Sequence, residues 1–221
     1  MDLHNLKLVT ADTETGGLDP FGNALLQIGA FDASTGSRLS LRCRPEGNLA
    51  VDEGARKVNG WPESHSGHEV VSERELVKRY QAWIAAVNPD FVIFHNAPFD
   101  VAFLKGAYHR QTQAPHPRAI CTMSYALALF AAGGLPISGS LSLNNIAKEL
   151  APNFVRDQTH CALEDAMLTW ECFVEMKNRL ENLGNLANKN AHEYIKQQQQ
   201  PGATGTSQAS YHRTRRIAGG R

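Results

Sequence analysis

The stretch LKLVTADTETGGL, residues 6–18, combines a β-strand pattern with two carboxylates and a glycine turn. Residues 6–11 are rich in Leu, Val and Thr, which favour strands. Asp12 and Glu14 follow where this apolar run ends. Because side chains alternate across a strand, their spacing of two points both carboxylates to the same face.

Two like charges on one face repel each other, so a fold that keeps them there usually supplies protons or cations. Carboxylate oxygens suit Mg²⁺ or Mn²⁺, with substrate phosphates completing the coordination shell. Taken alone, an acidic turn at the end of a strand is the simpler explanation of Asp12 and Glu14. Motifs elsewhere in the chain are needed to distinguish a metal site from such a structural turn.

Strand patterns and helix patterns alternate through the remaining sequence. Short turns separate the first three strands, which favours antiparallel pairing. Ser72 and Glu75 form a capping box that starts a helix, and this helix stops before Pro89. The expected strands are 6–11, 25–32, 38–44 and 91–95, and the expected helices are 72–88, 99–110, 122–130, 143–150 and 162–183. This order predicts a three-layer α/β domain.

Length and composition are those of an ordinary globular protein. The chain has 221 residues, of which 42% are hydrophobic and 20% charged, so a disordered or fibrous chain is excluded. No apolar run approaches the roughly 18–20 residues that span a bilayer, and no secretory signal is visible. Four cysteines without a CxxC pair are typical of free thiols in a reducing compartment. We therefore expect a soluble, cytoplasmic protein without a membrane partner.

Residues 184–221 differ from the rest of the chain. They hold six basic side chains against one acidic side chain, Glu193, although the formal net charge of the whole chain is +0. Their glutamines, glycines and small polar residues bury too little apolar surface to offset the entropy of ordering. We expect residues 1–183 to form one domain. Residues 184–221 should then be a Gln-rich, basic, flexible tail with one helical turn near 192–196.

The segment FHNAPFD, residues 94–100, places polar groups after a central strand. His95 and Asn96 close the strand, and Asp100 falls in the first turn of the next helix. An aspartate there also complements the helix dipole, so a structural role explains it as well as a functional one. Phe99 is either a core residue or a surface on which a base stacks.

The segment HCALED, residues 160–165, opens the last long helix. His160 and Asp165 are five residues apart, which on one helix would separate them by about 140°. Both serve one site only if His160 lies in the loop before the helix. There its imidazole is partly exposed, as a general base that meets water requires. We interpret Glu164 as a solvated charge.

Together, DTETGGL, HNAPFD and HCALEDA resemble, in this order, the DEDDh (DnaQ-like) 3′–5′ exonuclease family over residues 6–180. The segments LLQIGA, VNG and LSLNNIAKEL agree with this resemblance. It implies a ribonuclease-H-like three-layer fold with a mixed five-stranded sheet flanked by helices. It also implies a phosphodiester hydrolase that releases nucleoside 5′-monophosphates from single-stranded 3′ ends by two-metal hydrolysis.

The resemblance further implies a role for each matched residue. Asp12, Glu14 and Asp165 hold the first of two divalent ions, Mg²⁺ or Mn²⁺. Asp12 also reaches the second ion, which Asp100 supports through water, and His160 is the general base. The implied contacts to the terminal nucleotide are Thr13, Thr15, Gly16, Gly17, Leu18, Asn96 and Phe99.

Three activities remain open at this point. DNA 3′ ends, as in proofreading or repair, are the favoured substrate. An RNA 3′-end-processing exonuclease of the ribonuclease T type is the alternative, and acceptance of a 2′-hydroxyl distinguishes the two. The third is an accessory subunit whose tail, similar to the linkers of proofreading subunits, attaches to a polymerase. The intact acidic set argues against the third as the sole function.

Overall fold

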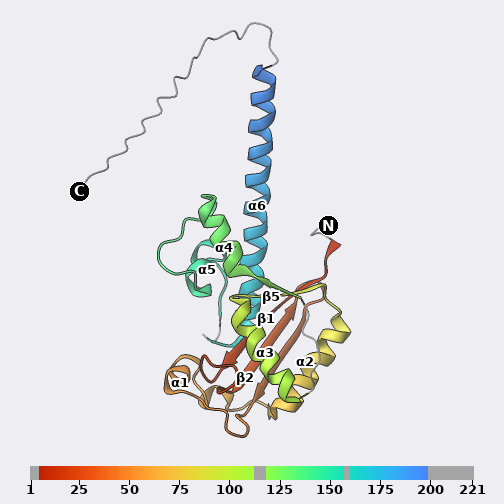
Figure 1. Ribbon diagram of the computed structural model, residues 1–221, viewed down its shortest axis with the longest axis vertical. Helices are drawn as coiled ribbons and strands as arrows, with labels where there is room; N and C mark the ends of the chain where they lie inside the picture. The colour runs from red at the N-terminus through yellow and green to blue at the C-terminus, as the bar shows by residue number, and fades with distance from the viewer. Residues whose placement is uncertain (1–4, 112–117, 157–159, 199–221) are drawn as a thin grey trace, which may run out of the picture. The chain divides into compact units, whose positions relative to one another are not determined.

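The computed structural model describes residues 5–111, 118–156 and 160–198 (Figure 1). Contacts divide the chain into a first unit, Met1–Glu181, and a second unit, Asn182–Arg221. Among the described residues, no helix has both the length and the apolar character that crossing a membrane requires.

The first unit is built on a mixed sheet with the strand order β4-β3-β2-β1-β5-β6. Its central strands β1, β2 and β3 pair antiparallel, whereas β4, β5 and β6 join in parallel. The strands are β1 (Leu8–Thr15), β2 (Leu25–Asp32), β3 (Ser37–Cys43), β4 (Val70–Val71), β5 (Phe91–Phe94) and β6 (Ala119–Cys121). The expected α/β class is confirmed. The sheet has six strands rather than five, because β4 and β6 are too short to leave an alternating pattern.

Helices cover both faces of this sheet. They are α1 (Glu53–Asn59), the short 3-10 helix η2 (Glu63–His65), α2 (Glu73–Val87), α3 (Ala97–Gln111), α4 (Thr122–Ala131), α5 (Leu143–Leu150) and α6 (Ala162–Gln198). Side chains of α2 and α3 form one core with residues of β1 and β2, such as Leu76 and Phe103 with Val9 and Ile28. The first turn of α6 lies against β2 on the opposite face.

The predicted start of α2 at Ser72 is confirmed through one half of the capping box, while the Glu75 carboxylate accepts a hydrogen bond from Nε of Arg79 at 2.8 Å. The Oγ atom of Ser72 accepts a hydrogen bond from the backbone N–H of Glu75 at 3.2 Å. At the other end, Asn88 has a left-handed φ of 50°, and its N–H donates to the carbonyl of Ile84. This conformation ends the helix, as asparagine and glycine commonly do.

The expectation that the last helix ends at Leu183 is wrong. Helix α6 continues to Gln198, well beyond one turn near residues 192–196. Gly184 lowers helix stability by about 1 kcal/mol, but the next helix breaker along the chain is Pro201. In the second unit, Leu186, Tyr194 and Ile195 of this helix are exposed. Residues 199–221 of the predicted tail lie outside the described residues, and the boundary at 183–184 stays a prediction.

Candidate active site

Strand β1 carries the acidic pair within its second half. Val9 and Ala11 face the core under α2 and α3. Asp12 and Glu14 are out of phase with them, so they project toward the face that carries the start of α6. Asp12 pairs with Gly29 and Glu14 with Gln27 of β2, so both carboxylates lie inside the strand. The apolar pattern of residues 6–11 predicts an end one residue before Asp12, whereas β1 continues to Thr15.

The first turn of α6 approaches β2 closely because residue 29 is glycine. A Cβ at Gly29 would collide with backbone atoms of Ala162 and Leu163. Gln27 holds the same turn, since its Oε1 accepts a hydrogen bond from the N–H of Ala162 at 3.4 Å and its Nε2 lies 3.8 Å from the Sγ of Cys161. These contacts bring Asp165, in the first turn, toward β1.

Glu14, His160 and Asp165 form a cluster in which one ligand atom from each residue lies within 4.8 Å of the others. His160 is partly exposed and precedes α6. Its φ is 59°, in the left-handed region that side chains other than glycine rarely adopt. Such strained positions are concentrated at functional sites, and they persist because the surrounding structure holds them.

Asp100 reaches this region from the first turn of α3. Its side chain is buried, and its Oδ1 accepts hydrogen bonds from the N–H of Thr13 at 3.0 Å and from the Thr13 hydroxyl at 2.8 Å. Because Thr13 stands between Asp12 and Glu14, these bonds fix α3 against the strand that carries the acidic pair. Asp100 therefore does more than complement the helix dipole.

Burial raises the pKa values of all four carboxyl groups, and repulsion among them adds to this effect at Asp12 and Glu14. Burial, followed by the charges of Asp100, Asp165 and Glu14, raises the pKa of Asp12 well above its usual value. Burial, followed by the charges of Asp165 and Asp100, raises the pKa of Glu14 to about 8. Burial raises the pKa of Asp100 to about 7, although the hydrogen bonds from Thr13 oppose it. Such a site favours protons or cations.

Arg156 supplies a positive charge beside Asp165. It forms an ion pair with Asp165 and a hydrogen bond with the side chain of Asn144. Burial raises the pKa of Asp165, while Arg156 and His160 lower it. Arg156 belongs to none of the three motifs, so no sequence pattern predicts its place beside Asp165.

A cavity of about 540 Å³ adjoins Glu14. Five of the seven predicted substrate contacts line it, namely Thr13, Thr15, Gly17, Leu18 and Phe99. Leu18 is 83% exposed and offers a free apolar side chain. The cavity therefore joins the acidic cluster to apolar surface.

The other two predicted contacts, Gly16 and Asn96, do not line this cavity. The N–H of Gly16 donates to the carbonyl of Ala24 at 2.7 Å, and its carbonyl accepts from the N–H of Asp52 at 2.6 Å. Asn96 is exposed and has a φ of 66° in the turn between β5 and α3. These hydrogen bonds fix Gly16 directly after β1, and a nucleotide contact by Gly16 or Asn96 stays a prediction.

Helix α1, which was not predicted, forms one wall of the cavity. Its last residue, Asn59, is buried and donates from Nδ2 to the carbonyl of Thr15 at 2.9 Å. Gly60 follows with a φ of 69° and ends the helix. The segment VNG therefore ties α1 to the end of β1.

Comparison with known proteins gives consistent results. The family model described as Exonuclease matches residues 9–173. DNA polymerase III subunit epsilon of Rickettsia felis is 26% identical over 198 residues, which cover 85% of this chain and 81% of that protein. Ribonuclease T of Haemophilus ducreyi is 29% identical over 193 residues, which cover 80% of this chain and 87% of that protein.

The fold has solved counterparts as well. An exonuclease I structure from E. coli, in complex with single-stranded DNA, superposes with a TM-score of 0.67 at 17% identity. The match covers 86% of this chain but 44% of that one, so this chain spans less than half the length of exonuclease I. At this identity the match shows the fold alone, which is ribonuclease-H-like. Because the family model spans residues 9–173, this chain belongs to the exonuclease family, in agreement with the DnaQ-like resemblance of its motifs, and is a nuclease.

Proposed function

We propose that this protein is a metal-dependent 3′–5′ exonuclease that releases nucleoside 5′-monophosphates from single-stranded DNA ends. The observation that carries the proposal is the convergence of Asp12, Glu14, Asp100 and Asp165 near His160, next to a cavity of about 540 Å³. This arrangement brings an acidic centre, a candidate base and apolar surface for a nucleotide together.

The donor set fits hard divalent cations. Carboxylate oxygens are the ligands that Mg²⁺ and Mn²⁺ prefer. The raised pKa values of Asp12 and Glu14 indicate that the four carboxylates lack sufficient positive charge around them. Asp12, Glu14 and Asp165 would hold one ion, and Asp12 with Asp100 the second. When bound, two such ions activate water and stabilise the oxygen that leaves phosphorus.

The chain's own residues provide the remaining functions. His160 is partly exposed and lies beside Glu14 and Asp165, which supports its role as the base that takes the proton of an attacking water. Thr13 orients Asp100 through two hydrogen bonds. In the cavity, Leu18 and Phe99 offer apolar faces on which the terminal base packs.

RNA 3′ ends are the alternative substrate, because the relatives include proteins named ribonuclease T as well as DNA polymerase III subunit epsilon. A polymerase or another protein is the proposed partner of residues 184–221. That interaction would be seen as a partner captured by the full chain and lost from a chain that ends at Gly184.

The test uses 5′-labelled single-stranded DNA, duplex DNA with a 3′ mismatch and single-stranded RNA of the same sequence, each with Mg²⁺ or Mn²⁺. We expect the labelled single-stranded DNA to shorten stepwise from its 3′ end and the reaction to stop in excess chelator. Full activity in chelator, or immediate release of the labelled 5′ nucleotide, would contradict the proposal. Faster shortening of RNA would establish the alternative.

Two variants test the assigned roles. Asp12→Ala should lower the rate by several orders of magnitude without unfolding the protein, because it relieves repulsion in the metal-free site. His160→Ala should lose most turnover and still bind metal and oligonucleotide. Glu171→Gln, which changes an exposed carboxylate of α6, is the matched control and should keep normal turnover. Near-normal turnover of His160→Ala at neutral pH would exclude His160 as the base.

A further inference from the structure

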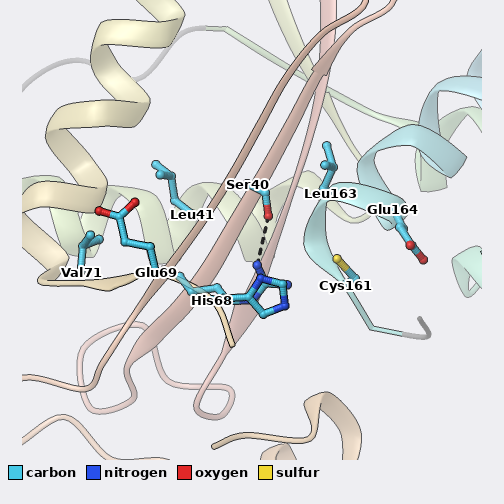
Figure 2. Close-up of a pocket in the computed structure, with 9 residues that line it drawn as sticks. Ser40, Leu41, His68, Glu69, Val71, Cys161, Leu163 and Glu164 are labelled. Atoms are coloured by element: carbon cyan, nitrogen blue, oxygen red, sulfur yellow. Dashed lines mark hydrogen bonds between the residues drawn. The ribbon is translucent and has the colours of Figure 1, made fainter. Parts of the chain in front are cut away.

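A second cavity, of about 420 Å³, lies between β3 and the start of α6. Ser40 and Arg42 of β3 and His68, which precedes β4, line one side, and Cys161 and Leu163 line the other. Figure 2 shows Ser40 and His68 facing Cys161 across this space. Cys161 and Leu163 belong to the HCALED segment, but none of the residues to which the motifs assign a role in the acidic cluster lines this cavity.

Arg42 is the unusual residue here. It is 7% exposed, yet it forms no ion pair with any residue that the structure describes. Its Nη1 donates to the Oγ of Ser40 at the long distance of 3.4 Å, and its buried Nε has no hydrogen-bond partner within the described chain. Buried charges are normally paired, because loss of hydration costs several kcal/mol per ion. A ligand that supplies negative charge would satisfy Arg42.

Among the described residues, neither of the two carboxylates that line the cavity forms an ion pair with Arg42. Glu69, which also lines the cavity, binds Arg79 through both oxygens, at 2.9 Å and 3.0 Å. Glu164 lies on the α6 side, where its charge raises the pKa of Asp165. The chain therefore leaves the Arg42 guanidinium for an anion from outside.

The position of Arg42 relative to the acidic cluster indicates which anion. Arg42 pairs with Gln27 across β2 and β3, and Gln27 pairs with Glu14 across β2 and β1. The three residues thus lie side by side on the same face. Adjacent strands are separated by about 4.8 Å, so the Cα atoms of Arg42 and Glu14 are about 10 Å apart. A short piece of nucleic-acid backbone spans such a distance past the start of α6.

We propose that this cavity, the Arg42 pocket, binds a backbone phosphate of the strand whose 3′ end occupies the acidic site. The inference rests on the proposed function and extends its substrate contacts beyond the terminal nucleotide. A guanidinium binds phosphate through paired N–H groups, and the exposed Ser40 hydroxyl at the rim is a further donor.

The first test compares strands of two to eight nucleotides as substrates of the full-length protein. In the wild type, kcat/KM should rise once the strand is long enough to reach the Arg42 pocket. In Arg42→Gln, the ratio of kcat/KM between the longest and the shortest strand should fall about tenfold, which is the usual effect of losing one hydrogen bond to a charged group. The effect should appear in KM and not in kcat.

Two further variants control this test. Arg38→Gln removes the same charge from an exposed position on the same face of β3, and its length dependence should equal that of the wild type. Ser40→Asp puts a carboxylate beside Arg42 at an exposed position, so it should weaken long strands as Arg42→Gln does, even if the latter fails to fold.

A binding measurement separates this proposal from the proposed function. Fluorescence anisotropy measures the binding of a labelled eight-nucleotide strand in chelator, where no hydrolysis is needed. The slope of the logarithm of the binding constant against the logarithm of the salt concentration should be flatter by about 0.7 in Arg42→Gln than in the wild type. Wild-type binding that depends on Arg42 without any hydrolysis would refute the proposed function and keep the pocket. The proposed phosphate site is refuted if Arg38→Gln and Arg42→Gln show the same dependence of kcat/KM on strand length, or if Arg42→Gln lowers kcat/KM equally for short and long strands. It is also refuted if Arg42 is needed to bind an acidic peptide but not the oligonucleotide.

Discussion

Gly29→Ala is the substitution whose effect on the acidic site follows most directly from the structure. The added Cβ would lie much closer than 3.0 Å to backbone atoms of Ala162 and Leu163, whereas ordinary contacts begin at 3.4 Å. Backbone atoms cannot rotate away as the end of a side chain can. The start of α6 would have to move by about 1 Å, and a misplacement of this size in an active site costs about 100-fold in rate.

The displacement should also lower stability. Overpacking of a dense contact costs about 1–3 kcal/mol, which corresponds to a fall in Tm of about 2–12 °C in a protein of this size. We therefore expect Gly29→Ala to fold, to melt earlier and to lose about 100-fold in kcat, because Asp165 and His160 shift relative to Asp12 and Glu14.

The assay is steady-state hydrolysis of a single strand together with thermal unfolding. Gly184→Ala is the matched control, since a Cβ at Gly184 meets no atom within 4 Å. It should keep normal kcat and gain stability, as alanine is the better helix former by about 1 kcal/mol. Wild-type kcat and Tm in Gly29→Ala would refute the argument that this glycine sets the position of α6.

Three further predictions concern charge and the second unit. Because the folded-state pKa of Glu14 is raised from 4.5 to about 8, the folded metal-free protein holds the extra proton between these values. Its Tm in chelator should therefore fall as pH rises from about 4.5 to about 8, and Glu14→Gln should flatten this slope, as pH-dependent calorimetry would reveal. Arg156→Gln removes the cation paired with Asp165, so titration calorimetry should find tighter Mn²⁺ binding; weaker binding would mean that Arg156 orders the site. A chain that ends at Gly184 should retain its kcat at saturating substrate, and a folded, metal-binding chain without turnover would place part of the site beyond residue 184.

The sequence predicted the elements that have a strong periodic pattern. The strand at 25–32 stands out as a mostly apolar run between turn signals, buried on both faces, and the helix that begins after Ser72 has one apolar stripe and defined ends. The three-residue strand Ala119–Cys121 is too short for a period. The helix predicted at 162–183 is shorter than α6. Gly184 and the polar residues after it indicate a helix end, although good helix formers such as Leu186 and Ala187 follow.

The candidate site likewise contains residues that the sequence predicts and residues that only the fold reveals. Asp12, Glu14, Asp100, His160 and Asp165 stand in motifs that a reader of the sequence can find. Gly29 and Gln27 lie in an apolar segment, and only the approach of α6 reveals their function. Arg42 looks like one more polar position of an alternating strand, because the burial of its charge depends on elements distant in sequence.

The alternation of side chains along β1 separates the carboxylates of the acidic cluster from residues of the neighbouring cavity. Its even positions, Asp12 and Glu14, contribute carboxylates, while Thr13 and Thr15 line the neighbouring cavity. A substitution at Thr15 therefore alters what the cavity accepts and leaves the carboxylates in place. Under the proposed function, the preference for one sugar or base can therefore change through cavity residues while the carboxylates of the acidic cluster stay the same. A register shift by one residue, in contrast, would exchange the two sets and abolish both.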